Sequence, residues 1–155
     1  MMQATVGKPL PDFVAIGTQG EVSPASLAGR RAVLYFYPKD NTPGCTTEAQ
    51  NFRDFYNDFL AANCQVIGIS RDSLKSHDGF IAKQNLPFPL VSDSDESLCA
   101  VFNVIKMKNM YGKQVRGIER STFLIDARGI LVQEWRRVRV AGHVDEVLQA
   151  ARVVA

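Results

Sequence analysis

Hydrophobic and polar positions follow several different periods along this chain. The longest apolar run covers residues 32–37, where six consecutive residues are apolar or aromatic, and a second, mostly apolar segment at residues 64–70 also predicts a buried strand. A run that is apolar at every position predicts a strand buried on both faces, as in the centre of a sheet. Pro38 ends the first run, because proline cannot donate a ladder hydrogen bond. Shorter strand patterns occur at residues 12–23, 87–93 and 121–138, and the first and last of these contain the glycines of hairpin turns.

Other segments repeat their apolar residues at helical spacing. In residues 45–63 these positions form one face of a helix, and they are Phe52, Phe55, Tyr56, Phe59 and Leu60. Similar patterns predict further helices at residues 73–84, 95–104 and 143–154, and Ser23 is a candidate cap for a short helical turn. Residues 106–117 have no clean period, so a loop is predicted there.

The order of these elements indicates the fold class. A strand, a helix, a second strand and a second helix are followed by a hairpin and a final helix. This order predicts an α/β fold in which a mixed central sheet is flanked by helices on both faces. It is typical of a thioredoxin-like sandwich. With 155 residues and no internal repeat or linker, residues 1–155 are expected to form a single domain.

Composition and charge narrow the classes of function. Apolar residues make up 46% of the chain and charged residues 22%, as in ordinary globular proteins. The net charge of +2 is too small to indicate a nucleic-acid partner or an anionic membrane surface. No stretch approaches the ~20 apolar residues that span a membrane, and the first residues lack the pattern of a secretory signal. A cytoplasmic protein is therefore expected.

The cysteines and histidines give no sign of a metal centre. Cys45, Cys64 and Cys99 are odd in number and widely spaced, which is unlike a disulfide framework. The sequence has no C-x-x-C pair, and His77 and His143 stand far from the cysteines and are expected at the surface. A tetrahedral metal site needs three or four converging ligands. Neither a metal nor another cofactor is expected.

The segment around Cys45 carries the candidate chemistry. A buried strand leads into the turn-forming residues KDNTPG, and Cys45 then opens the helix. The first N–H groups of a helix lack intrahelical partners, and its N-terminus has a partial positive charge, so a thiolate is stabilised there. A thiolate can attack the O–O bond of a peroxide and become a sulfenic acid. Thr42 can place its hydroxyl beside the sulfur, and Pro38 can shield it from water.

These residues also carry a family resemblance. The spacing Pro-x-x-x-Thr-x-x-Cys, formed by Pro38, Thr42 and Cys45, matches the active-site signature of the peroxiredoxins. Segments along nearly the whole chain resemble the bacterioferritin-comigratory, or Q-type, subfamily: GKPLPDF, YFYPKDNTPGCTTEAQNFRD, VIGISRDS, FPLVSDSDESLCAVFNV and RSTFLID. The resemblance implies a thioredoxin-like fold, hydrogen peroxide and organic hydroperoxides as substrates, a thiol reductant, and a monomer. It implies that Arg120, just before STFLID, holds the thiolate and orients the peroxide.

The chain departs from the family pattern in its second cysteine. Many Q-type members carry a resolving cysteine five residues after the first, where this chain has Gln50, and others carry it in the following helix, where this chain has Ile81. A one-cysteine mechanism is therefore expected, in which an external thiol resolves the sulfenic acid. Thioredoxin, glutaredoxin and a small thiol are the candidate reductants.

Several residues have simpler interpretations beside the functional ones. Cys64 and Cys99 are expected in the core, although resolution of Cys45 by either one stays an alternative. Thr42 also fits a turn or capping residue. Glu48 fits a residue that compensates the helix dipole, and it is not among the predicted catalytic residues. The basic run of Arg136, Arg137 and Arg139 is expected on an edge strand, where charge discourages pairing with other chains.

Three other classes of function are alternatives for a protein of this fold with a reactive cysteine. A disulfide oxidoreductase of this fold would need a C-x-x-C pair. A cysteine hydrolase would need a histidine base close to the sulfur, and His77 and His143 lack a local signature for that role. A redox-silent binding or holdase module is the third alternative, because fold alone does not determine function.

Overall fold

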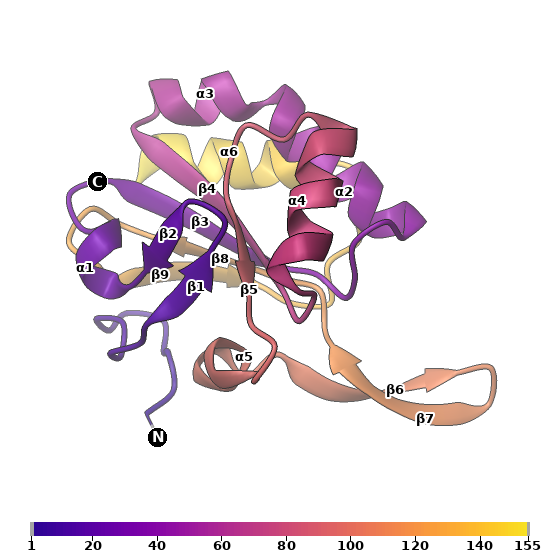
Figure 1. The fold of residues 1–155 in the computed structure, drawn as a ribbon. Helices are drawn as coiled ribbons and strands as arrows, with labels where there is room; N and C mark the ends of the chain where they lie inside the picture. The colour runs from indigo at the N-terminus through magenta and orange to yellow at the C-terminus, as the bar shows by residue number, and fades with distance from the viewer. Residues whose placement is uncertain (1, 155) are drawn as a thin grey trace.

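The computed structural model describes residues 2–154 and is built around a seven-stranded sheet (Figure 1). The strand order is β2-β1-β5-β4-β3-β8-β9. The strands of this sheet are β1 (Ala15–Gly17), β2 (Gly20–Val22), β3 (Arg31–Phe36), β4 (Cys64–Ser70), β5 (Leu90–Ser92), β8 (Ser121–Ile125) and β9 (Leu131–Trp135). Strand β4 runs parallel to β3 and β5, whereas β8 is antiparallel to β3 and β9. The predicted thioredoxin-like fold with a mixed sheet is confirmed.

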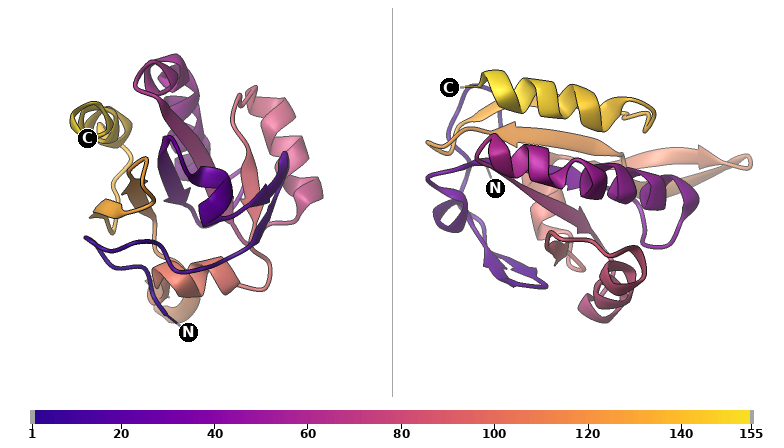
Figure 2. Two further views of the ribbon diagram at one scale, coloured as in Figure 1. Left: turned by 90° about the vertical axis from the view of Figure 1, so that its left-hand side faces the viewer. Right: turned by 90° about the horizontal axis from the view of Figure 1, so that it is seen from above.

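Helices cover both faces of the sheet (Figure 2). They are α1 (Pro24–Leu27), α2 (Pro43–Asp54), α3 (Tyr56–Ala61), α4 (Leu74–Gln84), α5 (Ser97–Phe102) and α6 (His143–Val153). Helices α2, α3, α4 and α6 pack on one face, and α1 and α5 pack on the other. Within residues 2–154, no helix has the length and apolar character needed to cross a bilayer.

Strand β3 is apolar at every position after Arg31, because each of its faces meets a different core cluster. Ala32, Leu34 and Phe36 belong to the cluster that includes α5, whereas Val33 and Tyr35 belong to the cluster that includes α2 and α6. Successive side chains of a strand point to opposite faces, so a strand covered on both sides needs apolar residues throughout. The prediction of a central strand at this place is confirmed.

The helix predicted for residues 45–63 is divided into two. Helix α2 begins at Pro43, two residues before Cys45, and ends before Phe55, which separates it from α3. Proline is favoured at the first position of a helix because its missing N–H has no partner there anyway. The predicted helical turn capped by Ser23 is confirmed, since the Ser23 side chain accepts a hydrogen bond from the Ser26 N–H.

The prediction of a loop at residues 106–117 is wrong. This segment forms a separate antiparallel hairpin of β6 (Ile105–Met110) and β7 (Lys113–Ile118), which projects from the body of the molecule (Figure 1). Most of its side chains are exposed or half-buried. Because neither face of the hairpin is fully covered by a core, no alternation of polar and apolar residues is needed, and the sequence signal for a strand is absent.

Candidate active site

The loop between β3 and α2 brings Pro38, Thr42 and Cys45 to the end of the sheet at which the central strand β3 finishes. Its tight turn includes Asn41 in a left-handed conformation with φ 63°, which asparagine tolerates better than most residues. Thr42 occupies the N-cap position of α2, and its hydroxyl donates a hydrogen bond of 2.7 Å to the Lys39 carbonyl. Pro38 is half-buried and follows the last core residue of the strand. The loop is thus folded back on itself directly before the helix.

Cys45 lies in the first turn of α2 and is 2% exposed. The Thr42 side chain makes no capping hydrogen bond to the backbone N–H groups of this turn. These N–H groups have no intrahelical partners and carry the positive end of the helix dipole. The sulfur therefore lies where a negative charge is favoured, as the sequence predicts.

Arg120 supplies a full positive charge at the sulfur. Its Nη2 atom lies 3.5 Å from Cys45 Sγ, although the two residues are 75 positions apart in sequence. The sheet explains the approach, because β8 pairs with β3 so that Ser121 stands opposite Phe36, at the end where the active-site loop begins. At Gly44 a Cβ atom would stand 3.1 Å from Arg120 Nη2, so the missing side chain leaves room for the guanidinium.

Glu48 holds the other end of the guanidinium. Its Oε1 atom accepts a hydrogen bond of 2.7 Å from Arg120 Nη1, and its side chain is fully buried. Among the described residues, nothing hydrogen-bonds to its Oε2 atom. Burial raises the pKa of Glu48 from 4.5 to about 7, while Arg120 acts in the opposite direction. Arg120 is therefore shared between the Cys45 sulfur and a carboxyl group that gains a proton near neutral pH.

Comparison with known proteins agrees with this geometry. Residues 6–134 match the model of the AhpC/TSA family. Peroxiredoxin Bcp of Xanthomonas campestris is 56% identical, over 94% of this chain and 90% of its own. Peroxiredoxin Bcp of Bacillus subtilis is 47% identical, over 97% of both chains. The chain is a peroxiredoxin of the AhpC/TSA family. It is of the Bcp, or Q, type, and it is a thiol peroxidase.

Solved structures support the same assignment of this peroxiredoxin. Peroxiredoxin Q of Xanthomonas campestris superposes with a TM-score of 0.88 at 53% identity, covering 96% of each chain. A trapped intermediate/ligand complex of the bacterioferritin comigratory protein from the same organism gives a TM-score of 0.88 at 52% identity, covering 96% of this chain and 98% of the other.

The peroxiredoxin also fastens its active-site loop through a buried polar network. The Tyr37 hydroxyl donates to Asp40 Oδ1 at 2.6 Å, and the Asp40 N–H donates to Asp72 Oδ2 at 2.9 Å. His77 Nδ1 lies 2.8 Å from Asp40 Oδ2, and His77 Nε2 lies 2.8 Å from the Val91 carbonyl. Burial disfavours the ionised form of Asp40 and by itself would raise its pKa. The hydrogen bonds from His77 and Tyr37 outweigh this effect, so the pKa of the carboxyl is lowered. The cluster of Asp40, Asp72 and His77 has the residue types of a metal site, and its polar atoms are hydrogen-bonded to one another, to the backbone and to neighbouring hydroxyl groups.

Both histidines lie in the interior, so the prediction that they are surface residues is wrong. His77 is 0% exposed and His143 is 5% exposed. His143 Nε2 lies 2.8 Å from the Thr122 hydroxyl, and burial lowers the pKa of this imidazole to about 4. A histidine can be buried when its ring nitrogens form hydrogen bonds with residues that are distant in sequence. No local sequence pattern indicates such partners. The imidazoles of His77 and His143 form hydrogen bonds with groups other than Cys45. The cysteine-hydrolase alternative therefore lacks a histidine base at the sulfur.

The other two cysteines lie away from Cys45. Cys64 pairs with Arg31 at the start of β3, about 15–20 Å along the strand from the active-site loop. Cys99 packs in the core cluster on the opposite face of the sheet. Burial raises the pKa of Cys64 to about 12 and also raises that of Cys99, so both thiols stay protonated at neutral pH. A disulfide needs Cα atoms within roughly 7 Å. The predicted core position of both cysteines is confirmed.

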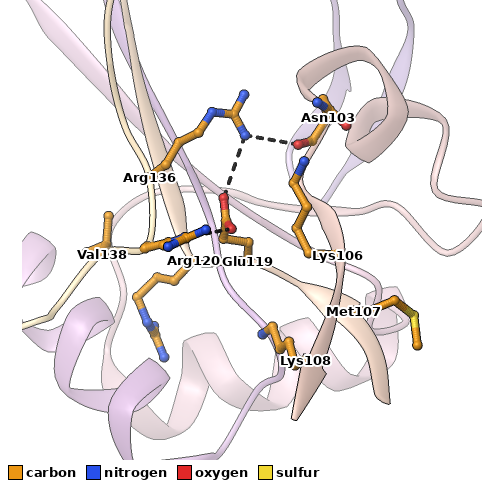
Figure 3. A pocket seen from close by; sticks show the side chains of 9 residues that line it. Asn103, Lys106, Met107, Lys108, Glu119, Arg120, Arg136 and Val138 are labelled. Atoms are coloured by element: carbon orange, nitrogen blue, oxygen red, sulfur yellow. Dashed lines mark hydrogen bonds and ion pairs between the residues drawn. The ribbon is translucent and has the colours of Figure 1, made fainter. Parts of the chain in front are cut away.

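A pocket of about 880 Å³ lies beside the site, between the β6–β7 hairpin and residues 136–138 (Figure 3). Arg120 lines it together with residues of the basic run predicted for an edge strand. Strand β9 is indeed the edge, but it ends at Trp135, so this run follows the strand instead of belonging to it. Arg136 donates to the Asn103 and Phe102 carbonyls at 2.9 and 2.8 Å. The run thus forms one wall of a cavity.

Glu48 is the functional-site residue that sequence reasoning leaves out. Its position three residues after Cys45 places it on the adjacent turn of α2. That spacing was the available signal, but a glutamate in the first turns of a helix is common for dipole reasons alone. The partner that distinguishes the two interpretations, Arg120, comes from a distant strand.

The pKa of Glu48 predicts a pH dependence of stability. The folded protein binds the Glu48 proton more tightly than the unfolded chain, so this contribution to stability is complete below about pH 4.3 and is lost as the pH rises through about 7. We expect Glu48→Gln, which removes the titration, to gain about 1–3 kcal/mol of unfolding free energy relative to the parent between pH 4.5 and 7. Urea unfolding at a series of pH values measures this difference.

The exposed Glu21 offers a matched control. Glu21→Gln should follow the parent at every pH, because the side chain is solvated in both states. Parallel pH curves for Glu48→Gln and the parent would show that Glu48 is an ordinary ionised carboxylate.

Proposed function

We propose that this peroxiredoxin reduces hydrogen peroxide and organic hydroperoxides at Cys45 by a one-cysteine mechanism with an external thiol. The observation that carries the proposal is the guanidinium of Arg120 at 3.5 Å from a sulfur in the first turn of α2. The solved Xanthomonas campestris complex, described for its alkyl peroxide reduction activity, supports organic hydroperoxides as a substrate class.

In the first step, the Cys45 thiolate attacks one oxygen of the hydroperoxide. The S–O bond forms as the O–O bond breaks, the departing RO⁻ takes a proton and leaves as an alcohol, and Cys45 becomes a sulfenic acid. Arg120 stabilises the thiolate before the attack and the negative charge on the departing oxygen during it. Fixed donors that face developing charge in a buried site are strong contributors to catalysis.

Thr42 and Pro38 shape the place where the peroxide binds. The Thr42 hydroxyl donates to Lys39, which leaves its oxygen lone pairs to accept the O–H of the incoming hydroperoxide. That hydrogen bond would turn the O–O bond toward the sulfur. In this proposal the half-buried Pro38, at the start of the loop, shields the sulfur and limits the access of water.

In the second step, a thiol from outside the chain resolves the sulfenic acid. Gln50 and Ile81 occupy the positions at which relatives of this type carry a second cysteine, and Cys64 and Cys99 lie elsewhere in the core. An incoming thiol R′SH forms a mixed disulfide with Cys45 and releases water. A second R′SH then regenerates the Cys45 thiol and leaves as R′SSR′. Thioredoxin, glutaredoxin and a small thiol are the candidate reductants.

The same proposal covers the working unit and its location. Residues 1–155 act as a single domain and as a monomer, which is supported by a site whose parts all come from one chain. A catalytic thiol regenerated by other thiols needs a reducing compartment, so we place the protein in the cytoplasm. No metal or other cofactor takes part in the proposed steps.

The nucleophile is tested by Cys45→Ser. We expect peroxide consumption driven by dithiothreitol to fall to the rate of the reagents alone, because a serine hydroxyl stays protonated and is a far weaker nucleophile. Cys64→Ala and Cys99→Ala serve as controls and should keep turnover. Turnover by Cys45→Ser close to that of the parent would refute the assignment.

The roles of Arg120 and Thr42 are tested by the rate of the first step. Arg120→Ala and Thr42→Val should each slow oxidation of Cys45 by hydrogen peroxide about 10²–10³-fold, the usual cost of removing one positioned hydrogen-bonding group. Arg120→Lys should fall between Arg120→Ala and the parent, because a lysine keeps the charge but not the two-pronged geometry. Competition kinetics against a reference peroxidase measures the rate constants. Values within about twofold of the parent would remove both residues from the mechanism.

The one-cysteine mechanism is tested by mass spectrometry. One equivalent of hydrogen peroxide should add a single oxygen atom to the protein, and a sulfenic-acid trap should label Cys45. An added small thiol should convert this species to a mixed disulfide. A Cys45–Cys64 or Cys45–Cys99 disulfide as the main product would contradict the proposal.

A further inference from the structure

The pocket beside Cys45 is strongly cationic. Its charged lining consists of Lys106, Lys108, Arg120, Arg136, Arg137 and Glu119. Five of these six side chains carry a positive charge and one carries a negative charge. Its volume of about 880 Å³ is far more than hydrogen peroxide needs and is typical of sites for larger small molecules. The pocket thus has the size and the charge of a site for an organic anion.

The arginines of the pocket already have acidic partners, whereas the lysines do not. Glu119 lies 3.9 Å from Arg136 and 3.7 Å from Arg137, and Arg120 is paired with Glu48. Within residues 2–154, no salt bridge or side-chain hydrogen bond involves Lys106 or Lys108. Both line the pocket from β6, where the end of Lys106 lies beside Asn103 and Lys108 extends toward Arg120 (Figure 3). Two ammonium groups are therefore available to a ligand.

Lys108 is held close to other cations instead of extending into solvent. Its side chain is half-buried, and a Cβ atom at Gly117 would stand 3.9 Å from its Cε and 3.8 Å from Arg71 Nη2. Burial and the neighbouring Arg120 lower the pKa of this lysine. An anion bound here would relieve the repulsion among these groups, and this gain favours its binding.

We propose that Lys106 and Lys108 form a carboxylate-binding subsite for a small molecule that reacts at Cys45. This inference rests on the proposed peroxidase function. Because no cysteine of the chain lies close to Cys45 in residues 2–154, the molecule favoured by the structure is an acidic thiol that resolves the sulfenic acid. Its carboxylate binds the two lysines while its sulfur reaches Cys45 past Arg120. A hydroperoxide that carries a carboxylate has the same binding chemistry and is the other source of such an anion.

The test compares charged and neutral forms of each reactant. For the second step, sulfenic Cys45 is reacted with 3-mercaptopropionate and with its methyl ester. For the first step, reduced Cys45 is reacted with linoleic acid hydroperoxide and with its methyl ester. The variant is the double substitution Lys106→Gln with Lys108→Gln. Lys113→Gln removes one charge from the same hairpin outside the pocket and is the matched control.

The readout is the ratio of the rate constant for the acid to that for its ester. We expect the double variant to lower the thiol ratio about fivefold or more, because two positive charges no longer attract the carboxylate. The difference between parent and variant should shrink at ~1 M salt, where surface charges are screened. Lys113→Gln should leave the ratio unchanged. A fall in the hydroperoxide ratio alone would support the subsite with the oxidising substrate as its ligand.

Two results would overturn the proposal. One is an acid-to-ester ratio within twofold of the parent for both the thiol and the hydroperoxide. The other is an equal loss of rate for acid and ester, which indicates a structural role for the lysines. Hydrogen peroxide consumption by the parent with dithiothreitol is measured in parallel, and its absence would refute the peroxidase function itself. If the parent protein consumes hydrogen peroxide but reacts equally fast with the acid and the ester, the subsite is refuted and the peroxidase function stands.

Discussion

The guanidinium of Arg120 is the contact around which the active site is organised. It bonds the Cys45 sulfur through Nη2 and the Glu48 carboxylate through Nη1, and thereby joins α2 to the strand β8. The contact exists because β8 pairs with β3 in a register that places Ser121 beside Phe36. Gly44 leaves room for it, since a Cβ atom there would stand 3.1 Å from Arg120 Nη2. A change in sheet register would move this charge away from the sulfur while leaving the cysteine at its helix end.

One cation shared by two acidic groups makes their charges interdependent. If Glu48 were ionised at all pH values, it would neutralise much of the field that Arg120 exerts on Cys45. Burial raises the pKa of Glu48 to about 7, so the carboxyl is only partly ionised near neutral pH while Arg120 keeps its charge. The buried Glu48 is thus compatible with a thiolate at the same guanidinium. Glu48 fixes the position of the arginine through a hydrogen bond that survives its own protonation, because a neutral carboxyl oxygen still accepts.

Sequence reasoning reached those parts of the structure that depend on local pattern. The two central strands were predictable because both faces are covered, which forces apolar residues throughout 32–37 and at most positions of 64–70. The turn residues before Cys45 predicted that a helix begins there, and α2 begins two residues earlier, at Pro43. The hairpin of β6 and β7 was missed because little of it is buried, and the interior positions of His77 and His143 were missed because their partners, Asp40 and Thr122, are distant in sequence. Arg120 was found only through the family resemblance, because nothing near it in sequence distinguishes it from the other basic residues.

The β6–β7 hairpin, which the sequence patterns predicted least well, is also the segment that best fits a role in binding small molecules. The hairpin contacts the core only at its base, through Ile105 and Ile118, so its lysines are at most half-buried and keep part of their contact with water. Strands β6 and β7 place Lys106 and Lys108 beside Arg120, whose own charge is directed inward to Cys45. The buried part of the site therefore holds the charge that faces the sulfur, and the outer part holds charge that can be offered to a ligand. In the proposed one-cysteine mechanism, the second half of the reaction depends on a thiol that enters from the exposed side, because the other cysteines lie in the core away from Cys45.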